Sequence, residues 1–434
     1  MTDSRVPALD IQGFGISRAR GFLPERNPIA GLPSRLHCWS KFYGKFPKYL
    51  ATGSLREAVR NMPVVDLSDF GGSEVEDAHV ESVMSFFSFL GHAWVYENWR
   101  QEPEKRIPKC IALPWCQIAK KLGRPPVLSY ASYALDNWSL LENVNLADAP
   151  KLGKTALINN FLGGMDEEWF ILIHIDIEVK AAPAIAAIGE AQLAALNNSL
   201  YELMMKLHVI SNAIEDMHDT LCRMPENCDP YIYYNRVRPY ITGFLRNPVI
   251  YEGVEEYGEQ PQRFFGETGA QSSVMPSLDA ALGIEHKDQW PENFIIRMRD
   301  YMPPGHRLFI EAVEQGPSIK QCVLEHRELM PELWNIYSEC VERLRLFRDK
   351  HLEYAALYIN KQAQISPHNP VDYGTGGTPM MPYLAKHRDD TTLESNRPKE
   401  KSNVSETQIS DTPCPDNSGD GADGPIGSSR VSQR

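Results

Sequence analysis

The longest helical pattern in this chain of 434 residues covers residues 333–361, a stretch without Gly or Pro. Alternating spacings of four and three place six of its side chains on one face of a helix. These are Cys340, Leu344, Phe347, His351, Tyr354 and Tyr358. A neutral imidazole on such an apolar face can ligate the iron of a porphyrin while its neighbours cover the ring. A histidine in this position is also often a core residue with a satisfied hydrogen bond, so the pattern alone leaves both interpretations open.

The composition and charge narrow the class of protein. A chain of this length with 42% hydrophobic residues can bury more than one core, which predicts two domains. The net charge of −13 argues against nucleic acid or an anionic membrane as a partner, because either would need a basic surface. The eight cysteines follow no CxxC spacing, so we expect neither a zinc site nor a disulfide framework.

The sequence contains no stretch that reads as a targeting or membrane segment. No charged-then-apolar signal begins the chain, and the most apolar run, residues 169–179, is interrupted by His174, Asp176 and Glu178. Such a run is too short and too polar to span a bilayer, which requires about 20 apolar residues. We therefore expect a protein of the reducing cytoplasm.

Periodicity divides the chain into segments of different character. Residues 1–50 are rich in Pro, Gly and Arg and predict an extended arm that wraps a core. Helical patterns follow at residues 54–60, 75–99, 115–122 and 128–141. Three prolines, Pro103, Pro108 and Pro114, predict an irregular connection before the third of these patterns.

The predicted architecture is all-α with two domains. The helical signal weakens at residues 149–154, so we place a boundary near residue 158. A small, mainly helical N-terminal domain with its extended arm would occupy residues 1–158, and a large all-helical domain would occupy residues 159–388. Residues 389–434 are rich in Ser, Thr, Asp, Gly, Pro, Lys and Asn without periodic apolar residues, which predicts a disordered tail.

Residues 171–179 fit two structures. Ile and Val alternate there with Leu, His, Asp and Glu, which taken alone is a strand pattern. The chain continues without a turn signal into a strongly helical stretch that reaches residue 224, so we expect one long helix. Phe170, His174 and Glu178 then share a face of it. This helix and the helix bearing His351 would dominate the second domain.

Five blocks of the sequence carry a resemblance: RLRLFRDKHLEYAALYI, RDYMPPGHRLFIEAV, GAQSSVMPSLDAALGI, PYITGFLRNPVIYEGV and GTGGTPMMPYL. Together they resemble the indoleamine 2,3-dioxygenase family of haem enzymes, in the family's order, over residues 10–388. The resemblance implies one haem b per chain, with the N-terminal domain covering its distal side. It also implies that His351, in the block FR-x-x-HL, is the proximal ligand of the haem iron.

The same resemblance, carried over position by position, implies a substrate site. Arg238 would pair with the amino-acid carboxylate, a contact that suits the planar guanidinium. The other matching positions are aromatic residues and a threonine of the mobile segment GTGGT: Tyr130, Phe170, Tyr234 and Thr375. Without the resemblance, Arg238 would be an ordinary ion-pair residue, the aromatic residues ordinary core, and GTGGT a surface turn.

On the haem side, the resemblance implies that Thr268 and Gly269 lie near the propionates. It also implies that Arg348 and Asp279 form a pair that supports the proximal side, for which an ordinary buried salt bridge is the alternative. The segment TGAQSS could also bind a phosphate through backbone N–H groups, but no nucleotide-binding pattern accompanies it.

Four residues depart from the animal members of the family. His174 stands where they have a small hydroxyl residue on the distal side, and it resembles the histidine of the related tryptophan 2,3-dioxygenases. It is the candidate catalytic residue, either as an acceptor for the indole N–H or as a donor to dioxygen. Tyr233 replaces Phe, Glu267 replaces Gly, and Tyr133 replaces a smaller residue at the pocket wall, so the substrate range is the property that the resemblance defines least.

The implied reaction inserts both atoms of dioxygen across the C2–C3 bond of L-tryptophan and yields N-formylkynurenine, in tryptophan catabolism by the kynurenine pathway. A reductant would bring ferric iron to the ferrous state, and we expect a monomer. Three alternatives remain open. They are a dioxygenase of secondary metabolism acting on a modified indole, a haem or dioxygen binder without turnover, and a helical interaction protein without haem.

Overall fold

The computed structural model describes residues 9–141, 145, 148–286, 294–365, 374–375 and 380–394. These residues all belong to one compact unit and are predominantly helical, so the predicted all-α class is confirmed. The α-helices are α1 (Phe46–Thr52), α2 (Leu55–Val59), α3 (Glu74–Asp77), α4 (Val80–Tyr96), α5 (Lys109–Leu122), α6 (Met165–Leu196), α7 (Leu200–Cys222), α8 (Pro230–Ile232), α9 (Arg238–Ile241), α10 (Val274–Leu282), α11 (Phe294–Arg299), α12 (Pro304–Gln315), α13 (Ile319–Glu325), α14 (Pro331–Ala355), α15 (Lys361–Ile365) and α16 (Met380–Glu394).

Short strands and tight helical turns complete the described part of the chain. The strands are β1 (Arg106–Ile107), which pairs in parallel with β4 (Ile250–Tyr251), and β2 (Trp138–Leu140), which pairs antiparallel with β3 (Thr155–Leu157). The predicted arm contains two 3₁₀ helices, η1 (Ile11–Phe14) and η2 (Ser34–Trp39). None of the helices in the described ranges is both long and apolar enough to cross a membrane.

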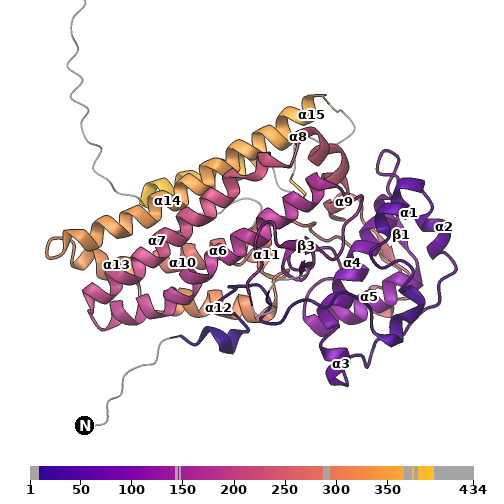
Figure 1. Ribbon diagram of the computed structural model, residues 1–434, viewed down its shortest axis with the longest axis horizontal. Helices are drawn as coiled ribbons and strands as arrows, with labels where there is room; N and C mark the ends of the chain where they lie inside the picture. Colours follow the sequence, from indigo (N-terminus) through magenta and orange to yellow (C-terminus); the bar gives the residue numbers. More distant parts are fainter. Residues whose placement is uncertain are drawn as a thin grey trace, which may run out of the picture. The chain divides into compact units, whose positions relative to one another are not determined.

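Three long helices, α6, α7 and α14, pack side by side (Figure 1). The Tyr354 hydroxyl of α14 donates to the Cys222 carbonyl of α7 at 3.1 Å, and Cys340 Sγ donates to the Leu207 carbonyl at 3.3 Å. Residue numbers increase in the same direction along both helices, from the Cys340–Leu207 contact to the Tyr354–Cys222 contact, so α14 runs parallel to α7. Since α7 folds back on α6 after a short turn, α6 runs opposite to both.

Helix α6 explains the strand-like pattern at residues 171–179. Ile171 and Ile175 are buried in a hydrophobic cluster with the N-terminal helices, whereas Ile173 and Ile177 are buried in a second cluster with α7 and α14. Residues four apart lie on one face of a helix, and residues two apart are separated by about 200°. The alternation therefore arises from a helix that packs on two opposite sides, and the predicted helix is confirmed.

The prediction that this helix continues to residue 224 was wrong. Helix α6 ends at Leu196, and α7 begins at Leu200. Between them Asn198 adopts a φ of 52°, a left-handed conformation that Asn accepts more readily than most residues. The Asn-Asn-Ser sequence at residues 197–199 is thus a turn signal that the surrounding helical periodicity obscured.

Two further expectations for the N-terminal region need correction. Residues 128–141 were expected as a helix, but they contain one π-helical turn, η3 (Ala131–Leu135), and strand β2. The amide of Asn137 donates to the Asn159 carbonyl at 2.9 Å, a partner that local periodicity cannot reveal. The connection expected around Pro114 is also shorter, because α5 begins at Lys109 and contains that proline.

Two further π-helical turns lie in the described chain, η5 (Tyr233–Val237) and η8 (Ala356–Asn360). The turn η8 directly follows α14. Such turns are rare, add one residue to the helical repeat, and occur frequently at functional sites. Here each of the three carries a buried tyrosine: Tyr133, Tyr233 and Tyr358.

The N-terminal helices share a hydrophobic core with a much later segment. His92 of α4 donates from Nδ1 to the Tyr240 carbonyl at 2.8 Å, and the Tyr96 hydroxyl donates to the Gly243 carbonyl at 2.9 Å. The cluster that buries α4 also includes Tyr251, Phe265 and Tyr301. The division at residue 158 stays a prediction, and this core contains residues from both sides of it.

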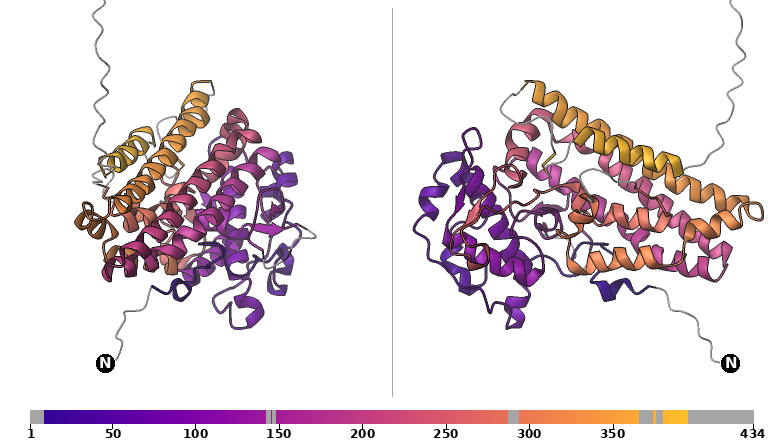
Figure 2. Two further views of the ribbon diagram at one scale, coloured as in Figure 1. Left: turned by 60° about the vertical axis from the view of Figure 1, so that its left-hand side comes forward. Right: turned by 180° about the vertical axis from the view of Figure 1, so that it is seen from behind.

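Helix α16 corrects the start of the predicted tail. Residues 389–394 belong to this helix, which lies along α14 (Figure 2). Thr391 is fully buried; its hydroxyl accepts a hydrogen bond from Arg348 and donates to the His387 carbonyl at 2.8 Å. Residues 395–434, the remainder of the predicted tail, lie outside the described residues.

Candidate active site

A cavity of about 250 Å³ lies where α6, α10, α14 and α16 meet the segment from Glu267 to Ser272. Apolar and aromatic side chains form much of its lining, and the aromatic ones from α14 and η8 are Phe347, Tyr354 and Tyr358. Leu221, Met224, Met275 and Ile295 add to this surface. A planar, largely apolar group with a few polar contacts would match such a lining.

His351 of α14 faces this cavity. Its side chain is exposed there, although Phe347, four residues earlier on the same stripe, is almost fully buried. Within the described ranges, its ring has no hydrogen-bond partner. Partial desolvation by the surrounding protein, and then the nearby His174 and Arg348, lower the pKa of His351 below its ordinary value. The imidazole is therefore neutral at pH 7 and keeps a lone pair, so it is not the satisfied core histidine of the alternative interpretation.

Arg348, one turn before His351, is held by Asp279 of α10. Its Nη2 atom lies 2.7 Å from each Asp279 oxygen. Burial alone would raise the pKa of Asp279, but Arg348 and His286 together lower it to about 2. The carboxylate stays charged over the physiological range, so the predicted pair is present, and both of its members also line the cavity.

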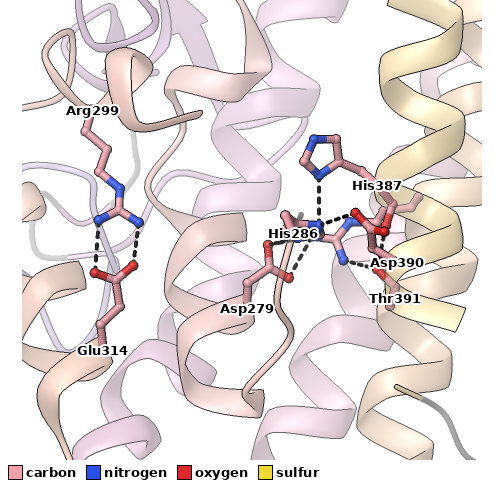
Figure 3. Close-up of polar contacts among 8 residues, drawn as sticks. Asp279, His286, Arg299, Glu314, His387, Asp390 and Thr391 are labelled. Atoms are coloured by element: carbon pink, nitrogen blue, oxygen red, sulfur yellow. Dashed lines mark hydrogen bonds and ion pairs between the residues drawn. The ribbon is translucent and has the colours of Figure 1, made fainter. Parts of the chain in front are cut away.

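Two further histidines extend this proximal network (Figure 3). His286 lies between Asp279, at 2.9 Å from its Nε2, and Asp390, at 3.4 Å from its Nδ1. The Nδ1 of His387 lies 3.0 Å from the Nδ1 of His286. Helix α16 is thereby tied to α10 beneath the cavity. Sequence reasoning missed His286 and His387, because about a hundred residues separate them and neither lies in a recognisable pattern.

His174 of α6 also lines the cavity, among residues expected on the distal side. Its Nδ1 lies 2.7 Å from the Phe170 carbonyl oxygen, which can only accept a hydrogen bond. Nδ1 therefore carries the proton. Burial lowers the pKa of His174, so the ring is neutral at pH 7 and Nε2 presents a lone pair.

The expected substrate residues fall into two groups. Three of them line the cavity, Phe170, Tyr233 and Thr375, and so do the expected haem-rim residues Thr268 and Gly269. The ring centroids of Phe170 and Tyr233 are 4.6 Å apart, which makes one aromatic surface. The Thr375 hydroxyl donates to the Glu267 carbonyl at 2.5 Å, which fixes the Gly-rich segment at this point.

The other group is buried behind the lining. The guanidinium of Arg238, a residue 2% exposed, lies 5.5 Å from the ring centre of Tyr234. Tyr133 packs against Phe170 with ring centroids 6.5 Å apart. The ring of Tyr130 lies 6.0 Å from that of His174 in an edge-to-face arrangement. These four residues form a second layer, behind the side chains that line the cavity.

Glu178 is a residue of this layer to which the sequence assigned no role. Its Oε1 accepts hydrogen bonds from the Tyr130 hydroxyl at 2.9 Å and from Ser272 at 2.7 Å. Burial raises its pKa to about 7, and those two hydrogen bonds limit the rise. The helical spacing of Phe170, His174 and Glu178 was the signal that could have identified it.

The residues present fit a haem group. His351 offers a neutral nitrogen with no other partner among the described residues, which is what a ferrous or ferric porphyrin requires of its axial ligand. Phe347, Tyr354 and Tyr358 on the same helix would cover the ring face. Thr268 and Gly269 provide a polar edge, where the Thr268 hydroxyl already caps a short helix by accepting from the Ala270 N–H at 3.4 Å.

Comparison with known proteins extends over nearly all the described residues. A family model described as indoleamine 2,3-dioxygenase matches residues 10–394. Indoleamine 2,3-dioxygenase 2 of Homo sapiens is 30% identical over 404 residues, 89% of this chain and 95% of the human protein. Indoleamine 2,3-dioxygenase nanC of Aspergillus nanangensis is 28% identical over 88% of this chain and 96% of its own length.

A relative with a different name matches over a similar share of the chain. Myoglobin of Haliotis madaka is 28% identical over 393 residues, 88% of this chain and 98% of its own length. The resemblance drawn from five sequence blocks is confirmed by the family model and by the relatives. The chain belongs to the indoleamine 2,3-dioxygenase family.

Proposed function

We propose that this protein is a haem-dependent dioxygenase that inserts both atoms of dioxygen across the C2–C3 bond of L-tryptophan and releases N-formylkynurenine. The observation that carries the proposal is His351, a neutral imidazole directed into a largely apolar cavity. Membership of the indoleamine 2,3-dioxygenase family supports the same activity. Bound haem would supply the activation of dioxygen, which no protein side chain provides.

On the proximal side, His351 would hold the haem iron through its unprotonated ring nitrogen. Arg348 and Asp279 would keep this part of α14 in register with α10, because their ion pair and the contact from His286 are buried and charge-assisted. Thr268 and Gly269 would meet the polar edge of the haem. These residues act as support and take no part in bond changes.

On the substrate side, Phe170 and Tyr233 would pack against the indole ring. The Nε2 of His174 would accept the indole N–H and orient C2 and C3 in the cavity. Arg238 would bind the substrate carboxylate after a local shift of the second layer, backed by Tyr234. Thr375 would help to enclose the substrate and exclude water.

Residues of the segment 1–158 would complete the distal wall of the cavity. Tyr130 and Tyr133 lie in this part of the chain and pack against His174 and Phe170, respectively. Their positions support our proposal that an N-terminal domain of residues 1–158 covers the distal side of a domain of residues 159–388. The pocket wall would then combine side chains from both.

We further propose a monomer in the cytoplasm that takes part in the kynurenine pathway and receives electrons from a cellular reductant when its iron becomes ferric. The net charge of −13 supports the expectation that neither nucleic acid nor an anionic membrane is a partner.

One alternative is a dioxygenase that acts on a modified indole. The Tyr133 hydroxyl is buried beside Phe170 and, within the described ranges, has no hydrogen-bond partner. A polar substituent on the indole ring would satisfy it. Relatives from Aspergillus nanangensis and Aspergillus candidus, each named as an indoleamine 2,3-dioxygenase, are 28% and 29% identical to this chain.

A second alternative is a haem protein that binds dioxygen without turnover. The relative named Myoglobin, which this chain matches over 98% of the relative's length, favours this possibility. Such a protein would have the same haem absorption but would yield no N-formylkynurenine. A helical interaction protein without haem would lack that absorption.

The test combines a haem spectrum with a product assay. Protein reconstituted with haem should show a Soret band, and the reduced form should convert L-tryptophan to N-formylkynurenine in air. His351→Ala should lose haem and activity together. His326→Ala is a matched control, because His326 is another histidine that is not fully buried, but its Nδ1 bonds the Cys322 carbonyl at 2.8 Å and it does not line the cavity.

The outcomes separate the candidates. A red protein without product formation would contradict the dioxygenase proposal and favour the dioxygen binder. Full haem occupancy in His351→Ala would contradict the ligand assignment. Product from a ring-substituted tryptophan with little from L-tryptophan would favour the modified-indole dioxygenase.

A further inference from the structure

Glu267 occupies a tightly fixed backbone position at the edge of the cavity. Its N–H donates to the Ile241 carbonyl at 3.2 Å, and its carbonyl accepts from the Thr375 hydroxyl at 2.5 Å. Just before it, Gly266 crosses Gly243 so closely that a Cβ atom on either glycine would overlap the backbone of the other. These contacts between two backbone segments hold Glu267 in one place, and its side chain lines the cavity.

The carboxyl group of Glu267 is buried, and it has no hydrogen-bond or ion-pair partner among the residues that the structure describes. The residue is 4% exposed. Burial raises its pKa to about 8, and no described cation offsets this. A buried carboxyl group without compensation destabilises the fold, so a donor group that enters the cavity would stabilise it.

Glu267 is also the cavity acid that remains available. The other acidic residue of the lining, Asp279, is held by Arg348 and His286. A zwitterionic amino acid brings one ammonium and one carboxylate group, and each needs an opposite charge when it leaves water. Under the proposed function Arg238 would take the carboxylate after a local shift. Glu267, as a protein acid of the lining that stands beside the expected position of the haem propionates, would take the ammonium group.

Tyr233 lies near both Arg238 and Glu267. Burial raises the pKa of its phenol, the charge of Arg238 lowers it, and the charge of Glu267 raises it again. Both groups therefore lie within electrostatic reach of one ring, which itself packs on Phe170. A substrate whose ring lies on Phe170 and Tyr233 would have the Arg238 guanidinium and the Glu267 carboxyl group within reach of its amino-acid end.

We propose that Glu267 is a specificity-determining residue that accepts hydrogen bonds from the ammonium group of the substrate. It would select indoles that carry a primary amine over indoles that carry only a carboxylate. This inference rests on the proposed function, since it concerns the indole that the same cavity takes.

Binding should then release a proton. In the ligand-free cavity, burial raises the pKa of Glu267 to about 8, which favours the neutral carboxylic acid at pH 7. An arriving ammonium group favours the carboxylate, so the carboxyl proton leaves to solvent while the ammonium keeps its own protons. The affinity for an ammonium-bearing indole should rise from pH 6 to pH 8, whereas the affinity for an indole without an amine should not.

The first measurement compares L-tryptophan with indole-3-propionate, which lacks the amine. In haem-loaded protein, Glu267→Gln should lower kcat/KM for L-tryptophan by roughly 10- to 150-fold, the range for a hydrogen bond to a charged group. It should leave the dissociation constant of indole-3-propionate within about 2-fold. Glu167→Gln is the matched control, because Glu167 is an equally buried acid that does not line the cavity and accepts from the Phe161 and Gly163 N–H groups, and it should leave the preference between the two ligands unchanged.

The second measurement is calorimetry of L-tryptophan binding at pH 7 in buffers of different ionisation enthalpy. The wild-type protein should release close to one proton per ligand, Glu267→Asp should still release it, and Glu267→Gln should release none. The Soret band and melting temperature of each variant report whether it is folded. If Glu267→Gln does not fold, the proton release and substrate preference of Glu267→Asp decide the matter.

An unchanged preference in folded Glu267→Gln would overturn the inference, and so would an equal loss of affinity for both ligands, which indicates a structural role. Proton release on L-tryptophan binding without product formation would support the role of Glu267 while contradicting the proposed function. A wild-type protein that binds neither ligand would overturn both.

Discussion

The Nδ1 atom of His174 lies 2.7 Å from a carbonyl oxygen of its own helix, and this contact determines what the other ring nitrogen can do. A neutral ring that donates from Nδ1 can only accept at Nε2. Of the two distal roles open to His174, acceptor for the indole N–H and donor to dioxygen, the geometry therefore favours the acceptor.

His174→Ser should consequently lower kcat/KM for L-tryptophan by about 2- to 12-fold, the range for one neutral hydrogen bond. The same variant should have little effect with 1-methyl-L-tryptophan, which has no indole N–H to donate. Steady-state kinetics with both substrates test this. An equal loss with both, together with faster decay of the oxygenated ferrous protein, would show that His174 donates to dioxygen instead.

For single residues, the sequence was informative about position where a periodic pattern or a motif located the residue. The spacing of four and three put His351 on a helix face, and the structure directs it into the cavity. The sequence could not show that Arg238 and Tyr133 lie in a second layer, because depth behind a surface depends on packing. Nor could it show the bond between His286 and Asp279, which depends on how a loop folds.

Among the elements, α16 has the most direct effect on the proximal side. Asp390 contacts His286, and Thr391 is buried against Arg348, the residue one turn before His351. The folded second domain was expected to end at residue 388, because the sequence that follows is polar. A polar sequence can still form a docked helix when its few polar side chains find buried partners.

Two truncations should therefore behave differently. A chain ending at Arg388 loses Asp390 and Thr391, and its melting temperature should fall by a few degrees, corresponding to about 2 kcal/mol. A chain ending at Glu394 should keep the wild-type melting temperature and haem content. Thermal unfolding of both proteins is the measurement, and equal stability of the two would show that the end of α16 contributes nothing.

The helices themselves were largely predictable, and their interruptions were not. Amphipathic spacing found α2, α4 and α14, and the double-sided pattern of α6 was recognised as helix. The π-helical turns left no trace in the sequence, because an added residue in one turn changes the phase of a pattern without changing its composition. All three of these turns carry tyrosines of the site region.

At the scale of the whole molecule, stability depends on contacts that join segments far apart in the sequence. His92 is fully buried, donates to the Tyr240 carbonyl and accepts from the Leu128 N–H at 3.0 Å. It joins α4 to a segment nearly 150 residues later. In the sequence His92 is one of several polar residues in a mainly apolar helix, and nothing nearby identifies either partner.

This arrangement predicts sensitivity to acid. Burial lowers the pKa of His92 to about 4, whereas in the unfolded chain it is near 6.5. Its stabilising contribution is complete above pH 6.5 and is lost as the pH falls toward 4, because the unfolded chain then binds the proton first. The loss attributable to this residue is at most about 3 kcal/mol.

His92→Gln should be less stable than wild type at pH 7.5, but the difference should shrink as the pH approaches 4. Denaturant unfolding at several pH values measures it. His208→Gln, on the exposed side of α7, serves as the control and should follow the wild-type profile. A parallel pH dependence for wild type and His92→Gln would exclude this source of acid sensitivity.

The crossing of Gly243 and Gly266 has a consequence for anyone who wishes to redesign this pocket. Since neither position accepts even a methyl group, the loop that presents Glu267 cannot be moved in small steps, and each attempt would separate the two backbones. A new substrate range has to come from exchanging side chains on a fixed frame. A combinatorial library restricted to Tyr133, Tyr233 and Glu267, with both glycines retained, would therefore sample more functional proteins than one of equal size that varies the loop itself.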